Sequence, residues 1–193
     1  MRPTNMINIP SKVTPRPAKG PFGERLNLMG ASALGLGLSP IAPGTCGALL
    51  GVFLHVVTVL LIAPSLQYWV LAAIFVSVCL MHFLLTPWAQ AHWSEQDPAH
   101  FVLDEVAGYL VVPLLVSADS LWQLVIWGFI SFRVFDIIKI PPARQIDERM
   151  HGALGIILDD LVSGIYAALF LYLIAAAAAQ VGFGGWLRVT FWI

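Results

Sequence analysis

Two pairs of adjacent acidic residues each stand directly before a long apolar stretch: Asp104-Glu105 and Asp159-Asp160. One such pair is explained by helix-start chemistry, since carboxylates favour the positive end of a helix dipole and cap free N–H groups. Two such pairs favour a functional site over helix capping, because ionisable groups beside hydrocarbon are costly and usually face a polar site. We predict that the four carboxylates form one site that holds a metal ion or positions water.

A glycine follows each acidic pair one helical turn later, as Asp104 precedes Gly108 and Asp160 precedes Gly164. Glycine at this spacing lets a second helix or a ligand approach the carboxylates closely. The spacing therefore predicts close helix packing beside the acidic residues.

Three further charged residues, Arg133, Asp136 and Lys139, recur every third position and so share one helix face. They form either a mutually neutralised ion-pair stripe or a functional set. In the functional interpretation, Asp136 is a further metal ligand, and Arg133 and Lys139 bind a phosphate. The stripe alone does not decide between these two interpretations.

The segment 39–47 is a stiff turn of proline and small residues that leads into an apolar helix. Thr45 is the expected N-cap of that helix. A helix N-terminus also binds anions through its free N–H groups, so Thr45 and Gly47 are candidate phosphate contacts. Glu95 and Asp97 belong either to a solvated loop or to the same site.

Carboxylates accompanied by arginine and lysine suit Mg²⁺, which prefers oxygen ligands and keeps substrate phosphates in its coordination shell. Bound Mg²⁺ would neutralise a phosphate, orient water and stabilise the leaving alkoxide. The residues therefore predict a metal-dependent site that acts on a phosphate.

The composition is that of an integral membrane protein: 59% of the 193 residues are hydrophobic and 11% are charged. No charged residue occurs between Arg25 and Glu95, a stretch that holds two membrane spans, expected at 47–63 and 66–85. A third span is expected at 161–179. The formal net charge of −1 gives no indication of nucleic-acid binding. We predict an all-α, polytopic membrane bundle with about three to five embedded helices.

The distribution of basic residues predicts a cytoplasmic N-terminus and a cytoplasmic loop at 139–155. The segment 106–138 forms either two tilted spans or a re-entrant hairpin. In both cases the acidic residues meet at the cytoplasmic face. The predicted domains are a disordered tail over 1–25, a membrane domain over 26–180 and an interfacial tail over 181–193, anchored by Trp186, Phe191 and Trp192.

Four blocks together resemble the phosphatidylglycerophosphatase A family, in that family's order and spacing: Ser39–Gly47, Asp97–Gly108, Phe132–Lys139 and Gly155–Gly164. The resemblance covers roughly residues 26 to 175. It implies Mg²⁺-dependent hydrolysis of phosphatidylglycerophosphate, a lipid substrate, to phosphatidylglycerol at the bacterial inner membrane. The chain departs from the family mildly, with Ile140 where the family usually has proline and Ser163 where it usually has alanine.

Three other functions agree less well with the sequence than a lipid phosphatase does. A cation transporter would need a polar route across the membrane, and the expected spans carry few polar residues at mid-depth. A scaffold for anionic lipids would need basic rather than acidic clustering. A phosphatidyltransferase would carry an Asp-Gly-x-x-Ala-Arg signature, which the sequence lacks.

Overall fold

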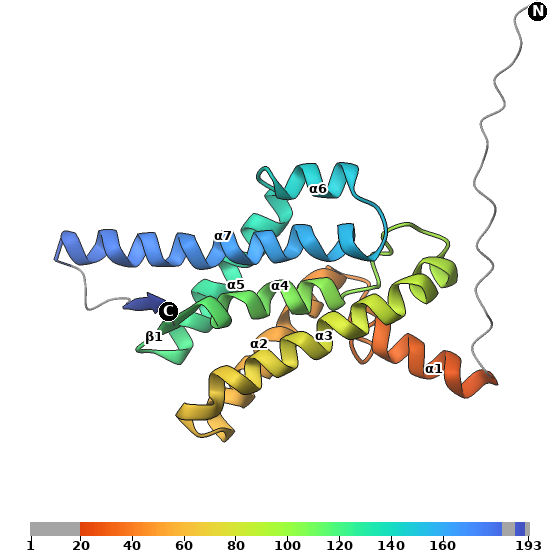
Figure 1. Cartoon of the computed structure of the whole chain (residues 1–193), viewed down its shortest axis with the longest axis horizontal. Helices are drawn as coiled ribbons and strands as arrows, with labels where there is room; N and C mark the ends of the chain where they lie inside the picture. Colours follow the sequence, from red (N-terminus) through yellow and green to blue (C-terminus); the bar gives the residue numbers. More distant parts are fainter. Residues whose placement is uncertain (1–19, 183–187, 192–193) are drawn as a thin grey trace, which may run out of the picture.

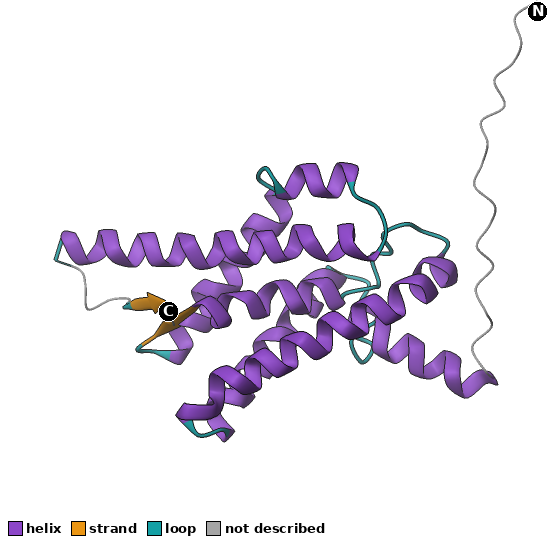
Figure 2. Ribbon diagram, viewed as in Figure 1, coloured by secondary structure: helices purple, strands orange, loops and turns teal. Residues whose placement is uncertain are grey.

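The computed structural model describes residues 20–182 and 188–191. Within these ranges, four helices are long and apolar enough to cross a membrane, which confirms the predicted all-α membrane bundle (Figures 1 and 2). They are α2 (Pro43–Leu61), α3 (Pro64–Trp93), α5 (Leu121–Ile138) and α7 (Ala153–Gln180). The shorter helices are α1 (Gly20–Ala31), η1 (Leu36–Leu38), α4 (Leu103–Leu115) and α6 (Ala143–Arg149).

Helix α4 forms the centre of the bundle and packs against α2, α3, α5 and α7. Its residues from Leu103 to Pro113 are almost all buried, as expected of a helix that is apolar on every side. At 1.5 Å per residue α4 is about 20 Å long, which is shorter than the hydrocarbon core of a bilayer. The segment 106–138 therefore consists of this short buried helix followed by α5, which is long enough to span.

A small antiparallel sheet joins the end of α4 to the C-terminal part of the chain. Strand β1 (Val116–Ala118) pairs with β2 (Val189–Phe191) in the register Val116↔Phe191, and the Phe191 ring lies 4.6 Å from the Tyr172 ring of α7. Figure 1 shows this sheet at the end of the bundle opposite the first turns of α4 and α7. The acidic residues therefore lie at one end of the molecule and the sheet at the other.

Helices α4 and α7 run side by side (Figure 1) and touch at the two glycines noted in the sequence. A Cβ added to Gly164 would collide with the backbone oxygen of Gly108 and lie 2.9 Å from the Val111 Cβ. A Cβ added to Gly108 would lie 2.9 Å from the backbone oxygen of Asp160. The predicted close helix approach beside the acidic residues is thus confirmed.

Two predicted helix starts are wrong. Helix α7 begins at Ala153, after Gly152 with φ 78°, so Asp159 and Asp160 lie in its second turn rather than opening it. The apolar residues 153–158 extend the helix toward its N-terminus because they continue its buried face. Helix α2 begins at Pro43 with Ala42 as its N-cap, so Thr45 lies within the first turn and is not the cap.

The predicted tails are tested only in part. Helix α1 begins at Gly20, so residues 20–25 are helical, contrary to the expected disordered tail that ends at residue 25. Residues 1–19, Trp186 and Trp192 lie outside the described residues. The membrane domain expected over 26–180 and its tails otherwise stay predictions.

We expect Gly164→Ala to destabilise the protein by about 1–3 kcal/mol, because the new methyl group would force α7 away from α4. The measurement is the thermal unfolding midpoint in detergent. Ala177→Leu, which enlarges an exposed side chain of the same helix, is the control and should leave the midpoint unchanged. An unchanged midpoint for Gly164→Ala would contradict the close contact of the two helices.

Candidate metal centre

Three carboxylates from two helices converge at one end of the bundle. Asp104 and Glu105 come from the first turn of α4, and Asp160 comes from the second turn of α7. One oxygen atom of each lies within 4.8 Å of the others. This separation is reached because the glycine contact between α4 and α7 lies one turn further along both helices. These three residues are called the acidic cluster below.

Two residues of the acidic cluster are buried and Glu105 is half-buried, and one oxygen atom of each has no hydrogen-bond partner. Asp104 is 7% exposed and Asp160 is 3% exposed. Asp104 Oδ1, Glu105 Oε2 and Asp160 Oδ2 are buried atoms without a partner. An ionised carboxylate buried in this way costs several kcal/mol unless a cation or a proton compensates it.

The fold brings the three carboxyl groups together where their ionised forms are disfavoured unless a cation is present. Burial raises the pKa of Glu105 above its ordinary value. Burial, followed by repulsion from Glu105 and Asp160, raises the pKa of Asp104 well above its ordinary value. Three convergent oxygen donors that lack partners fit a hard divalent cation, which would supply the missing positive charge. The acidic cluster therefore has the donor set of a metal site.

Arg133 and Asp136 lie beside the acidic cluster on α5. Arg133 Nη1 and Asp136 Oδ2 form an ion pair across one helical turn. The Asp136 carboxyl also lies within hydrogen-bonding reach of Asp160. Arg133 Nε is buried without a partner, so the guanidinium keeps a donor for a further acceptor. The stripe on α5 thus contains an ion pair and also contacts the acidic cluster.

Lys139 links three segments of the chain at the end of α5. Its Nζ donates hydrogen bonds to Asp159 Oδ2 at 2.6 Å and to Asp147 Oδ1 of α6 at 2.8 Å. Burial lowers the pKa of Lys139, but the two carboxylates outweigh burial and raise the pKa above its ordinary value. Lys139 is therefore a cation, and Asp159 pairs with it rather than joining the acidic cluster.

The first turn of α2 covers the acidic cluster from another side. A Cβ on Gly44 would collide with Glu105 Oε1 and lie 3.4 Å from Arg133 Nη1. A Cβ on Gly47 would lie 2.7 Å from the Val102 Cβ, so Gly47 permits helix packing. Gly44 thus lies against the charged groups, a contact that the sequence did not indicate, and the phosphate contacts of Thr45 and Gly47 stay predictions.

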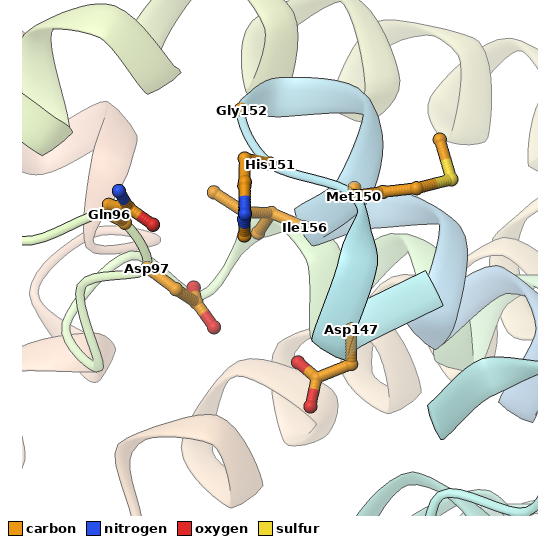
Figure 3. A pocket seen from close by; sticks show the side chains of 8 residues that line it. Gln96, Asp97, Asp147, Met150, His151, Gly152 and Ile156 are labelled. Atoms are coloured by element: carbon orange, nitrogen blue, oxygen red, sulfur yellow. The ribbon is translucent and has the colours of Figure 1, made fainter. Parts of the chain in front are cut away.

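A hollow of about 140 Å³ is lined in part by Asp147, which accepts a hydrogen bond from Lys139. Figure 3 shows the Asp97 and Asp147 carboxylates pointing into the same space, with His151 nearby. Burial raises the pKa of Asp97, and the charge of Lys139 opposes this rise. Asp97 is nonetheless an exposed residue of the loop after α3 and is not among the three converging carboxylates, so a role of Glu95 or Asp97 in the site stays a prediction.

Sequence reasoning missed Gly44 and Asp147 as members of this region. Asp147 stands in a charged segment, Arg144–Arg149, and nothing in its spacing sets it apart from its neighbours. Gly44 lies in a segment that was considered, but only the fold shows which of its residues reaches Glu105. Both contacts are long-range and have no local signal.

The family described as Phosphatidylglycerophosphatase A matches residues 29–175. The chain is 35% identical over 145 residues to the phosphatidylglycerophosphatase A of Escherichia coli, which covers 75% of this chain and 80% of that protein. It is 33% identical over 145 residues to the Haemophilus influenzae protein of the same name, which covers 75% of this chain and 85% of that protein.

A third relative carries a different name. The chain is 33% identical over 152 residues to a Bacteroides thetaiotaomicron protein whose assignment as a phosphatidylinositol-3-phosphatase is provisional, which covers 78% of this chain and 92% of that protein. No solved structure gives a significant match. The residues matched by the family include the acidic cluster, the α5 stripe and the first turn of α2, and the chain is a phosphatase that belongs to the phosphatidylglycerophosphatase A family.

Proposed function

We propose that this protein hydrolyses phosphatidylglycerophosphate to phosphatidylglycerol and inorganic phosphate, with Mg²⁺ held by Asp104, Glu105 and Asp160. The observation that carries the metal assignment is the set of buried, unpartnered oxygen atoms on these three residues. The substrate assignment is supported by membership of the family and by the two relatives of that name.

The bound cation would supply charge neutralisation for the phosphate and for the leaving alkoxide. Arg133 holds the phosphate from the side of α5, since its Nε is free to donate and Asp136 fixes its orientation. Planar guanidinium donors match two phosphate oxygens at once. The first turn of α2, which contains Thr45, packs against Glu105 and Arg133 at Gly44, and its free N–H groups would add further donors for the phosphate.

Asp136 and Asp159 have positioning roles in this proposal. Each has a cationic partner, Arg133 for Asp136 and Lys139 for Asp159. A carboxylate that orients a neighbouring ligand or cation supports the site without binding the metal itself. Lys139 is partly exposed and contributes positive charge at the rim, where a substrate that carries two phosphate groups needs it.

We also propose that the acidic cluster faces the cytoplasm in a bacterial inner membrane. The described basic residues Lys139, Arg144 and Arg149 lie in the loop and the short helix at this end of the bundle. Such residues favour the cytoplasmic side of a membrane. This sidedness supports a substrate that is reached from the cytoplasmic leaflet.

Removal of the metal tests the function directly. Purified protein in detergent should release phosphate from phosphatidylglycerophosphate in Mg²⁺ and lose this activity in excess chelator, and added Mg²⁺ should restore it. Phosphatidylinositol 3-phosphate, assayed in parallel, tests the chemistry named for the Bacteroides relative. Release that is indifferent to chelator would refute the metal mechanism, and a preference for the inositol lipid would refute the proposed substrate.

Asp160→Asn should reduce phosphate release at least about 100-fold, since an amide is a poor ligand for a hard cation. The variant should still insert into membranes and, without metal, should unfold at the same or a higher temperature, because a buried unpartnered charge has been removed. Mg²⁺ should raise the melting temperature of the wild type but not of Asp160→Asn. Asp119→Asn, at an exposed site in the turn before α5, is the matched control.

Wild-type turnover by Asp160→Asn would remove this residue from the site. Loss of activity with an unchanged Mg²⁺-induced stabilisation would show instead that Asp160 acts on the substrate and not on the metal.

Arg133→Lys should lower kcat/KM about 10- to 100-fold, because lysine keeps the charge but lacks the planar fork that binds two oxygen atoms. The comparison is Arg144→Lys, which alters an exposed arginine of α6 that pairs with Glu148 and should change kcat/KM little. Equal effects of the two substitutions would argue against a specific phosphate contact by Arg133.

A further inference from the structure

An apolar groove runs between α5 and α7 on the outer surface of the bundle. It has a volume of about 280 Å³. Its lining is aliphatic and aromatic, and the Tyr166 hydroxyl is the single polar side-chain group among the six residues: Phe135, Ile140, Tyr166, Leu169, Phe170 and Leu173. None of the residues assigned to the acidic cluster or to phosphate binding lines this groove.

Aromatic packing fixes the shape of the groove. The Phe135 ring lies 5.8 Å from both the Tyr166 ring and the Phe170 ring. The Tyr166 hydroxyl donates a hydrogen bond to the Pro141 carbonyl oxygen at 2.8 Å. This bond ties the chain that follows α5 to α7, so the groove is bounded at one end by the polar loop that carries Lys139.

The groove and the acidic cluster share the same stretch of helix. Phe135 precedes Asp136, and Ile140 follows Lys139, so one turn of α5 places charged groups toward the site and apolar groups toward the groove. On α7, Tyr166 is about 9 Å and Leu173 about 20 Å beyond Asp160, at 1.5 Å per residue. The groove therefore begins near the level of the site and continues along the apolar part of α7.

We propose that this groove holds an acyl chain of the lipid phosphate substrate while the phosphate lies at the acidic cluster. The proposal rests on the proposed function. A lipid whose phosphate reaches Arg133 must leave the site toward hydrocarbon, and two residues that line the groove, Phe135 and Ile140, are the direct chain neighbours of Asp136 and Lys139. Lys139, at the junction, provides positive charge where the anionic head group passes from the polar loop to the groove.

The groove positions the chain by shape, because an acyl chain that leaves the bilayer gains no hydrophobic energy on entering an equally apolar groove. Its effect is therefore on the placement of the phosphate, and misplacement at a reacting centre is costly. A second copy of this chain would be the alternative occupant, and oligomeric state distinguishes the two.

The test compares two substrates with the same head group: long-chain phosphatidylglycerophosphate in mixed micelles, and its water-soluble deacylated form. Leu173→Trp fills the groove 13 residues from Asp160 and touches no charged group. It should lower kcat/KM for the long-chain lipid about 10-fold and leave that for the deacylated form unchanged. Leu80→Trp, at an exposed leucine of α3 outside the groove, is the matched control.

Equal loss on both substrates, or no loss on either, would overturn the proposal, as would a change of oligomeric state in Leu173→Trp on light scattering. A second measurement tests whether the groove holds an acyl chain even if the protein releases no phosphate. Failure to release phosphate would by itself refute only the proposed function. A lipid phosphate with a photoreactive acyl chain should label residues 169–173 by mass spectrometry. Excess unlabelled lipid phosphate, but not diacylglycerol, should suppress this label, and labelling elsewhere would overturn the proposal.

Discussion

The site depends on one backbone contact, the crossing of α4 and α7 at Gly108 and Gly164. Packed helix axes are ordinarily 8–10 Å apart because side chains separate them, whereas here the backbone of one helix meets the backbone of the other. One turn before this contact, Asp104 and Glu105 face Asp160 across a gap small enough for a single ion. A side chain at either glycine would widen that gap, so the packing of two apolar helices sets the distance between the carboxylates.

The same contact concentrates ionisable carboxyl groups in a buried place, at a cost to stability. The outer carboxylates are compensated, since Lys139 pairs with Asp159 and Asp147, and Arg133 pairs with Asp136. The central three are not, and each leaves an oxygen atom without a partner. The cationic side chains thus form a rim around an uncompensated acidic centre, an arrangement that suits a cation within and an anion between the cation and the rim. Burial of α4 on all sides offsets this local cost.

The sequence predicted the acidic residues and their glycines because both signals are local and periodic. The sequence did not show which of Asp159 and Asp160 faces the other carboxylates. Neighbours on a helix point about 100° apart, so Asp160 faces α4 while Asp159 faces Lys139, and only the position of the partner helices shows which is which. The start of α7 at Ala153 was missed because the expected span began after the charged pair. Gly44 and Asp147 were missed because their partners lie on other helices.

The position of the charged residues relative to the apolar surface then constrains how a substrate arrives. Arg133 and Asp136 point from α5 toward the acidic cluster, while Phe135 lies on the outer side of the same turn, in the groove. A molecule that satisfies both surfaces must carry an anionic group and an apolar chain joined by a short connection, and it must approach along the membrane rather than from bulk water. A soluble phosphate meets only the first surface, and a neutral lipid meets only the second. In the proposed function, selectivity for a lipid phosphate would therefore follow from the two faces of one helical turn.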